Sequence, residues 1–259
     1  MEKLSERQPL PCAGEESARL KPARSKTFSR AYFKEAAALI KNVKILAFAA
    51  VICALRIAVK SLSVPIAPGV YLSFDCYVNA VGAMVYGPIF ALLVGAVSDT
   101  LGAVLFPKGA YFFPFIAVEM LSGFIFALFL WRKKITAPRL LLAKFTVNFL
   151  CNIVLNSAIQ KWYYALFVTD KVYYMINGVR IVKNLAIFPL EAVLICVLLN
   201  ALLPGLKSLG YADKSQEGIA LEKKELLLCG AFAVLSVAIV LFYVFFLRDF
   251  VAAHNIKLF

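Results

Sequence analysis

The chain has 259 residues, 62% of them hydrophobic, and a mean hydropathy of +0.82. A single water-soluble core of this length cannot bury so much apolar surface, so we expect lipid to cover the rest. The formal charge of +13 could indicate nucleic-acid binding, but ten Lys and Arg residues lie in residues 1–44 and five more between two hydrophobic stretches, in residues 132–144. Basic residues so placed orient membrane proteins, and we expect no nucleic-acid partner.

Seven hydrophobic stretches are candidates to cross the membrane, which takes roughly 20 mostly apolar residues in a helix. Residues 1–42 lack an apolar core after their charges, so they are expected to form a basic cytoplasmic tail rather than a signal peptide. The loop after the first stretch contains Pro65 and Pro68 and cannot be a continuous helix, while Gly87-Pro88 turns the second stretch directly into the third. The expected spans are 43–59, 75–86, 89–106, 112–131, 140–165, 181–203 and 226–247.

The distribution of basic residues predicts the orientation of these spans. With the N-terminus in the cytoplasm, the inner segments carry nineteen Lys and Arg residues and the outer segments eight. The sequence thus predicts an all-α integral membrane protein with six transmembrane helices in 43–203, a cytoplasmic loop in 204–225, an additional C-terminal transmembrane helix in 226–247 and a short tail in 248–259. A final hairpin that re-enters the membrane would instead keep the C-terminus inside.

Residues typical of metal and redox chemistry are sparse. The six cysteines are scattered without a C-x-x-C pair, and the only histidine, His254, lies five residues from the end. A His-based metal site or an internal His base therefore has no candidate. We expect no metal ion, no cofactor and no catalytic group.

A polar stripe marks the fifth span. Its members recur at every fourth position and share one slowly drifting face of a helix: Lys144, Asn148, Asn152, Asn156 and Gln160. Such groups are costly in lipid, so this face must meet protein or water. The amides could join helices, at about 1 kcal/mol per hydrogen bond. Alternatively, Asn152, Asn156 and Gln160 could form hydrogen bonds with a ligand that has donor and acceptor edges.

The sixth span carries Arg180, Asn184 and Glu191 on one face. Arg180, near the outer surface, could hold a ligand carboxylate bidentately or could be a simple interfacial anchor. Glu191 lies at about mid-membrane and is interpreted as structural, either protonated or paired with an unidentified partner.

Three further carboxylates interrupt or begin spans. Asp99 in the third span and Glu119 in the fourth could, with Glu191, form the acid/base set of a polytopic membrane enzyme that acts on lipid. They lie on separate helices without a nucleophile motif, so an interior packing role is favoured. Asp75, at the start of the second span, is interpreted as a helix N-cap.

Aromatic residues crowd the expected outer loops, where interfacial belts are normal. Tyr111 and Trp162 lie in the same layer as Lys108, Gln160 and Arg180. A flat aromatic ligand could be sandwiched there with its charged end held by the basic groups.

The first span carries Ala50, Ala54 and Ala58 at every fourth position. Small residues at this spacing let another helix approach closely. The face could pack against the protein's own helices or dock a partner subunit.

Three stretches together resemble a known family. They are residues 87–109, with Gly87-Pro88 and Gly95-Ala-Val-Ser-Asp99-Thr-Leu-Gly102; the amides of the fifth span; and residues 180–191, Arg180-Ile-Val-Lys183-Asn184-Leu-Ala-Ile-Phe-Pro189-Leu-Glu191. The chain resembles the substrate-binding S components of energy-coupling-factor (ECF) vitamin transporters of bacterial cell membranes, within them the folate family.

The resemblance covers about residues 43–203. It implies a six-helix S-component bundle whose pocket opens outward and binds folate or a reduced folate. It also implies a membrane scaffold (T) subunit, docked on alanines spaced as Ala54 and Ala58, and two ATPase subunits, since this chain lacks a G-x-x-x-x-G-K-[ST] motif. The basic tail and the seventh span are additions to the usual form, and residues 75–79 replace a more apolar start of the second span.

The sequence therefore predicts a membrane subunit that captures folate outside and makes no covalent change. The remaining alternatives are an S component for another vitamin, the lipid enzyme described above, and a scaffold or chaperone in which the amides only join helices. The expected substrate-binding residues are Lys108, Tyr111, Asn152, Asn156, Gln160, Trp162, Arg180 and Asn184.

Overall fold

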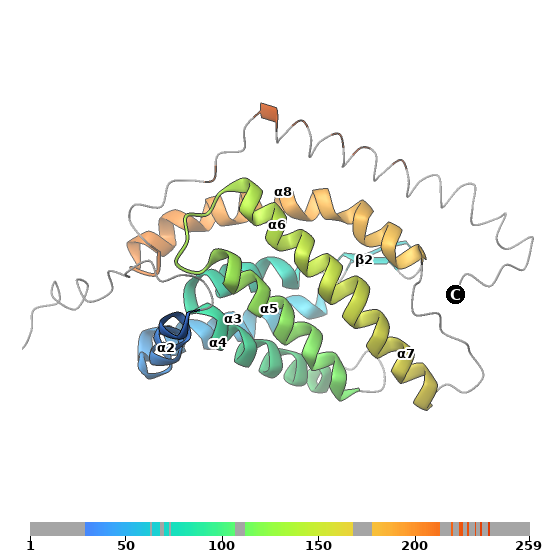
Figure 1. The fold of residues 1–259 in the computed structure, drawn as a ribbon, viewed down its shortest axis with the longest axis horizontal. Coiled ribbons are helices and arrows are strands. Elements are labelled where there is room, and N and C mark those ends of the chain that lie inside the picture. Colours follow the sequence, from blue (N-terminus) through green and yellow to red (C-terminus); the bar gives the residue numbers. More distant parts are fainter. Residues whose placement is uncertain are drawn as a thin grey trace, which may run out of the picture.

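The computed structural model describes residues 29–62, 64–67, 70–72, 74–106, 112–167 and 178–212, together with seven single residues between 219 and 238. These residues form a bundle of long helices that run side by side (Figure 1). Most of the expected N-terminal tail, and nearly all of the expected span 226–247 and tail 248–259, lie outside the described residues and stay predictions.

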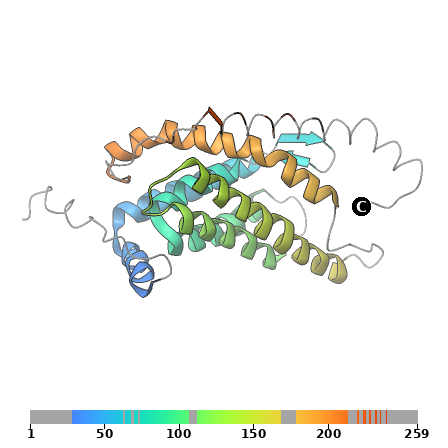
Figure 2. The ribbon, with the colours of Figure 1, turned by 45° about the horizontal axis from the view of Figure 1, so that its top comes forward.

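The described chain begins with two helices set at a right angle. Helix α2 (Arg30–Ala38) starts where the Ser29 side chain accepts a hydrogen bond from the Tyr32 amide at 3.1 Å, a normal N-cap. A short 3-10 turn, η1 (Leu39–Lys41), leads into α3 (Val43–Ser61), which Asn42 caps in the same way. The axis of the segment Arg30–Lys41 differs from that of Val43–Ser61 by 86°. Figure 2 shows α2, in blue, projecting from the bundle.

The loop after α3 is not helical, as its prolines predict, but it contains two short strands that the sequence did not indicate. Strands β1 (Val64–Ala67) and β2 (Val70–Leu72) pair antiparallel, with Val64 opposite Leu72. The chain then enters α4 (Asp75–Leu105).

Helix α4 comprises the second and third predicted spans, which meet at Gly87. Gly87 has φ 79° and ψ −177°, a backbone that L side chains rarely adopt, and a Cβ there would lie 2.8 Å from the Trp131 ring. Beyond Gly87 the chain folds back on itself. A Cβ placed on Gly123 would lie 3.1 Å from Asn79 Oδ1 and 3.0 Å from the Ala91 carbonyl, so both of these residues of α4 lie beside Gly123. In a straight helix, residues twelve apart are about 18 Å apart.

The rest of the bundle consists of three further helical rods. A 3-10 turn, η2 (Phe113–Phe115), opens α5 (Ile116–Leu130); α6 (Ala137–Thr146), η3 (Val147–Leu155) and α7 (Asn156–Phe167) form one continuous rod; and α8 (Gly178–Ser208) runs beside it (Figure 1). The sequence predicted a helix throughout 140–165, but η3 is a π-helix, whose hydrogen bonds join residues five apart.

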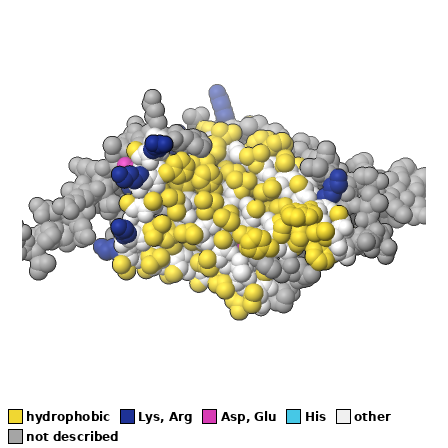
Figure 3. Space-filling view, turned by 60° about the horizontal axis from the view of Figure 1, so that its bottom comes forward, with side chains coloured by type: hydrophobic (Ala, Val, Ile, Leu, Met, Phe, Trp, Pro, Cys, Tyr) yellow, Lys and Arg dark blue, Asp and Glu magenta, His cyan; other side chains and the backbone are white. Residues whose placement is uncertain are grey.

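The surface confirms a membrane protein. In the described chain, four helices are long and apolar enough to cross a membrane, or five if the bent pair Arg30–Lys41 and Val43–Ser61 is one span. Large exposed side chains such as Val51, Leu93, Val104 and Phe145 are apolar. Figure 3 shows hydrophobic side chains across the middle of one face, with most Lys and Arg side chains toward one end. This is the surface that lipid requires.

Candidate functional site

The polar stripe of the fifth span lies on α6, η3 and α7, and its members Lys144 and Asn148 contact α8. At the end that is inner in the predicted topology, Lys144, almost fully buried, forms an ion pair with Glu191 of α8 at 2.9 Å. Lys144 is therefore the partner of Glu191 that the sequence alone did not identify. One turn outward, the Asn148 side chain donates to the Asn184 carbonyl at 3.4 Å, and the Asn152 side chain donates to Asn148 Oδ1 at 3.1 Å.

The π-helix keeps this stripe in line. In an α-helix with 3.6 residues per turn, a step of four residues overshoots one turn, so a four-residue stripe drifts around the helix. The wider π turn makes the same step fall short, which offsets the drift. Asn148 and Asn152 lie inside η3 (Val147–Leu155), and Asn156 begins α7. π-Helical segments recur at functional sites.

Exposure increases along the stripe from its inner to its outer end. Lys144 and Asn148 are buried, at 1% and 4% exposure, whereas Asn152, Asn156 and Gln160 are half-buried. The inner members thus contact other parts of the same bundle, as the helix-joining interpretation expects. The outer members are accessible enough to meet a ligand.

The other predicted binding residues lie only partly among the residues that the structure describes. Trp162 of α7 is 54% exposed and packs edge-to-face on Phe112, with ring centroids 5.4 Å apart. Asn184 is half-buried beside Asn148. Arg180 lies in the first turn of α8, where only the backbone is described. Lys108 and Tyr111 lie outside the described residues, so their place in a site stays a prediction.

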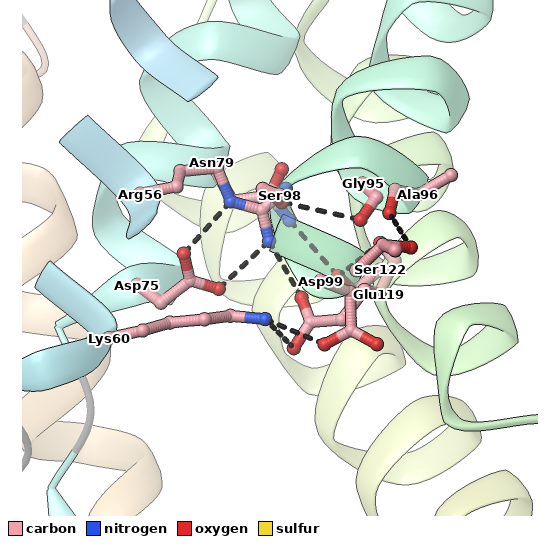
Figure 4. Close-up of polar contacts among 11 residues, drawn as sticks. Arg56, Lys60, Asp75, Asn79, Gly95, Ala96, Ser98, Asp99, Glu119 and Ser122 are labelled. Atoms are coloured by element: carbon pink, nitrogen blue, oxygen red, sulfur yellow. Dashed lines mark hydrogen bonds and ion pairs between the residues drawn. The ribbon is translucent and has the colours of Figure 1, made fainter. Parts of the chain in front are cut away.

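A second polar cluster, which we call the Arg56 network, joins α3, α4 and α5 (Figure 4). The fully buried Arg56 donates from Nε and Nη2 to the two carboxylate oxygens of Asp75, each at 2.8 Å. Its Nη2 also contacts Glu119 Oε2 at 2.6 Å. One turn along α3, Lys60 Nζ lies 2.8 Å from Asp99 Oδ1 and 3.4 Å from Glu119 Oε1.

This network corrects two sequence-based interpretations. Asp75 is not an N-cap: the helix begins at Asp75 itself after Phe74, and the carboxylate binds Arg56. Asp99 and Glu119 are on separate helices but not isolated, because Lys60 bridges them. Each carboxylate is paired with a cation, as buried charges require, and their role in packing the interior is the one the sequence favoured.

The ion pairs of Arg56 and Lys60 with these carboxylates were not predicted from the sequence. Both lie on one face of the first span, four residues apart, and intramembrane cations need partners. That spacing, together with the acidic residues that begin or interrupt the neighbouring spans, was the available signal.

The three alanines of α3 occupy the side of the helix opposite this network. Ala50, Ala54 and Ala58 are all exposed, while Ile52 and Arg56 are buried against the bundle. The alanines therefore do not pack against the protein's own described helices. They form a flat, accessible face.

Comparison with known proteins identifies relatives for most of this bundle. Residues 40–203 match the family model of the ECF-type riboflavin transporter, S component. The folate transporter FolT of Clostridium novyi (strain NT) is 32% identical over 157 residues, which cover 60% of this chain and 88% of that protein. The folate transporter FolT of Leuconostoc mesenteroides subsp. mesenteroides is 28% identical, over 50% of this chain and 70% of that protein.

A solved structure has the same fold. The crystal structure of FolT bound with folic acid superimposes with a TM-score of 0.50 at 26% identity, covering 57% of this chain and 87% of that one. The family and the relatives are transporters, so the chain is not an enzyme, and the lipid-enzyme alternative with Asp99, Glu119 and Glu191 was wrong. The match over residues 40–203 shows that the chain belongs to the S components of ECF-type transporters.

Proposed function

We propose that this S component binds folate or a reduced folate on the outside of a bacterial cell membrane. The observation that carries the proposal is the relationship to two FolT proteins, one of which shares 32% identity and is covered over 88% of its length. The match to a FolT structure with folic acid bound points the same way. The family model carries the name of riboflavin, which makes riboflavin the competing ligand.

The polar groups of the stripe suit the chemistry of folate. Folate joins a flat pterin, which has amide-like donors and acceptors, to a glutamate tail with two carboxylates. Asn152, Asn156 and Gln160 offer donors and acceptors for the pterin edge. Arg180 and Lys108, nearer the outer end in the predicted topology, suit the carboxylates. Tyr111, Trp162 and Asn184 complete the proposed binding set.

A direct binding measurement tests the ligand. The full-length protein, purified in detergent, is titrated calorimetrically with folate, with riboflavin and with a panel of other vitamins. We expect folate to bind and an equal concentration of riboflavin not to displace it. Binding of riboflavin without folate would show that the family model, and not the FolT relatives, indicates the ligand.

We further propose that the alanine face of α3 docks onto a membrane scaffold subunit driven by two ATPase subunits. Ala50, Ala54 and Ala58 are exposed and small, so a helix can approach closely. Ala54→Trp or Ala58→Trp should abolish uptake in cells but leave folate binding by the isolated subunit intact. Val104→Trp, at an exposed site on α4, is the matched control and should leave both intact. Uptake that survives both alanine variants would exclude this face.

The same proposal includes an orientation, with the N-terminus in the cytoplasm. Single cysteines placed at Lys108 and Lys171 should react with an impermeant thiol reagent added outside intact cells, and one at Lys134 should not. The reverse pattern would invert the topology.

A further inference from the structure

Helix α2 precedes the region that the S-component family model matches, which begins at residue 40. It therefore lies outside the part of the chain that the family model matches. It lies at 86° to α3. If α3 crosses the membrane, a helix at a right angle to it runs along the membrane surface.

The inner side of α2 packs against α4 and against the C-terminal half of α5. Tyr32 is 3% exposed, donates from its hydroxyl to the Ala127 carbonyl at 3.4 Å, and packs edge-to-face on Trp131 with ring centroids 4.8 Å apart. Phe33 stacks on Phe124, seven residues before Trp131. Seven residues are about 10 Å of helix, so α2 covers the side of α5 near its end and lies at the rim of the bundle.

The outer side of α2 is basic. Arg30 and Lys34 are exposed and, at about 100° per residue, lie nearly opposite the buried Tyr32 and Ala36. Lys41 and Lys44, just beyond α2, are exposed as well. The single carboxylate in α2, Glu35, forms an ion pair with Arg132 of the bundle.

We propose that α2 lies in the membrane surface and that its basic side binds the phosphates of anionic lipid headgroups. Three features support this partner: the right angle to α3, the attachment at the rim of the bundle, and a row of cations with no acidic residue of α2 among them. Amphipathic basic helices of this kind are attracted to anionic lipids, and each Lys or Arg near the surface adds to the attraction. Neighbouring apolar side chains, Ile40 and Val43, are exposed at the level where α3 begins.

Lipid selectivity of the full-length protein tests the proposal. The midpoint of thermal unfolding is measured in mild detergent while phosphatidylglycerol or phosphatidylcholine is added. We expect phosphatidylglycerol to raise the midpoint more, and this preference to shrink in high salt, which screens surface charges. The triple variant Arg30→Gln/Lys34→Gln/Lys41→Gln should lose the preference, and the charge-conserving triple variant Arg30→Lys/Lys34→Arg/Lys41→Arg should keep it. Equal responses of the wild type to both lipids would overturn the proposal.

A depth measurement covers the case in which the neutral variant does not fold. Cys12 and Cys229 are first replaced by Ser, and a fluorophore is attached at Lys34→Cys in vesicles that contain phosphatidylglycerol. Spin-labelled lipid headgroups should quench the fluorophore strongly, and labels deep in the acyl chains only weakly. Quenching by water-soluble agents alone would place the basic side of α2 in the aqueous phase, either free or bound to a protein. That result would refute the lipid site.

Discussion

The Arg56 network and the polar stripe both place polar groups inside an apolar bundle, but the contacts of those groups differ. In the network, the fully buried Arg56 holds Asp75 through two bonds of 2.8 Å and reaches Glu119 at 2.6 Å. In the stripe, Lys144 pairs with Glu191 at 2.9 Å at one end, but the next member, the amide Asn148, reaches α8 through a longer bond of 3.4 Å. The network spans three helices with short charged contacts, and the stripe becomes more exposed toward its outer end.

This difference separates a structural role from a binding role. Charges buried against several short-range partners are committed to those partners, and removing one partner leaves another charge uncompensated. Half-buried amides can exchange their contacts for those of a ligand at small cost. The charged contacts of the Arg56 network therefore join α3, α4 and α5, and the proposed recognition surface lies on η3, α7 and α8.

The largest expected effect is that of removing the central cation. Arg56→Leu takes the guanidinium from the buried Asp75 and leaves the half-buried Glu119 with Lys60. Breaking a buried pair in this way costs about 3 to 5 kcal/mol. Thermal unfolding in detergent should show a large loss of stability, whether or not folate is present. The control is Arg139→Leu, at a half-buried position where the guanidinium donates to the Lys134 carbonyl and pairs with no carboxylate among the contacts of the described residues. A loss no larger than that of the control would refute the structural role of the network.

A smaller effect, which tests the boundary between the two regions, is expected at the inner end of the stripe. Glu191→Leu leaves Lys144 buried without its carboxylate and should cost about 3 kcal/mol. The double variant Lys144→Met/Glu191→Leu removes both charges and should recover most of that loss, because buried pairs replaced by apolar residues are often neutral. The same unfolding measurement applies. A double variant as unstable as the single one would mean that the pair itself stabilises the bundle.

Parts of the fold followed from the sequence because they depend on local chemistry. Hydrophobic length predicted the spans, and Gly87-Pro88 predicted the reversal, since one residue adopts positive φ and the other ends the preceding helix. The expectation that Asp75 is an N-cap failed because capping preferences consider only the nearest backbone amides. In the fold, the Arg56 guanidinium from another helix binds that carboxylate through two hydrogen bonds of 2.8 Å.

The pairing of side chains on different helices could not be predicted in the same way. Lys144 and Glu191 were both singled out, but their contact depends on the depth and rotation of α6 and α8, which hydrophobic periodicity does not specify. The π-helix was not predictable either, because the sequence pattern of η3 is compatible with an ordinary α-helix. Of the proposed site, the stripe was predictable from its spacing.

The last and smallest expected effect concerns recognition, and it separates the two ends of folate. Asn156→Leu removes a directed hydrogen bond to the pterin in our proposal and leaves an unpaired polar atom on the ligand, which costs about 1 to 3 kcal/mol. Arg180→Ala removes a charged hydrogen bond to the glutamate tail, worth about 1.5 to 3 kcal/mol when partly shielded. Because pteroate lacks the glutamate, Arg180→Ala should weaken folate more than pteroate, whereas Asn156→Leu should weaken both by similar factors.

Calorimetric titration of both ligands into each variant measures these differences. Asn148→Leu is the matched control within the stripe, since Asn148 is buried and already bonded to Asn184 and Asn152. We expect it to lower the unfolding midpoint slightly and to change the affinity for folate less than Asn156→Leu does. Equal losses for folate and pteroate in Arg180→Ala would exclude Arg180 as the residue that holds the tail. Undiminished binding in Asn156→Leu would mean that the outer amides, like the inner ones, only join helices, because a ligand that used them could not lose that hydrogen bond without loss of affinity.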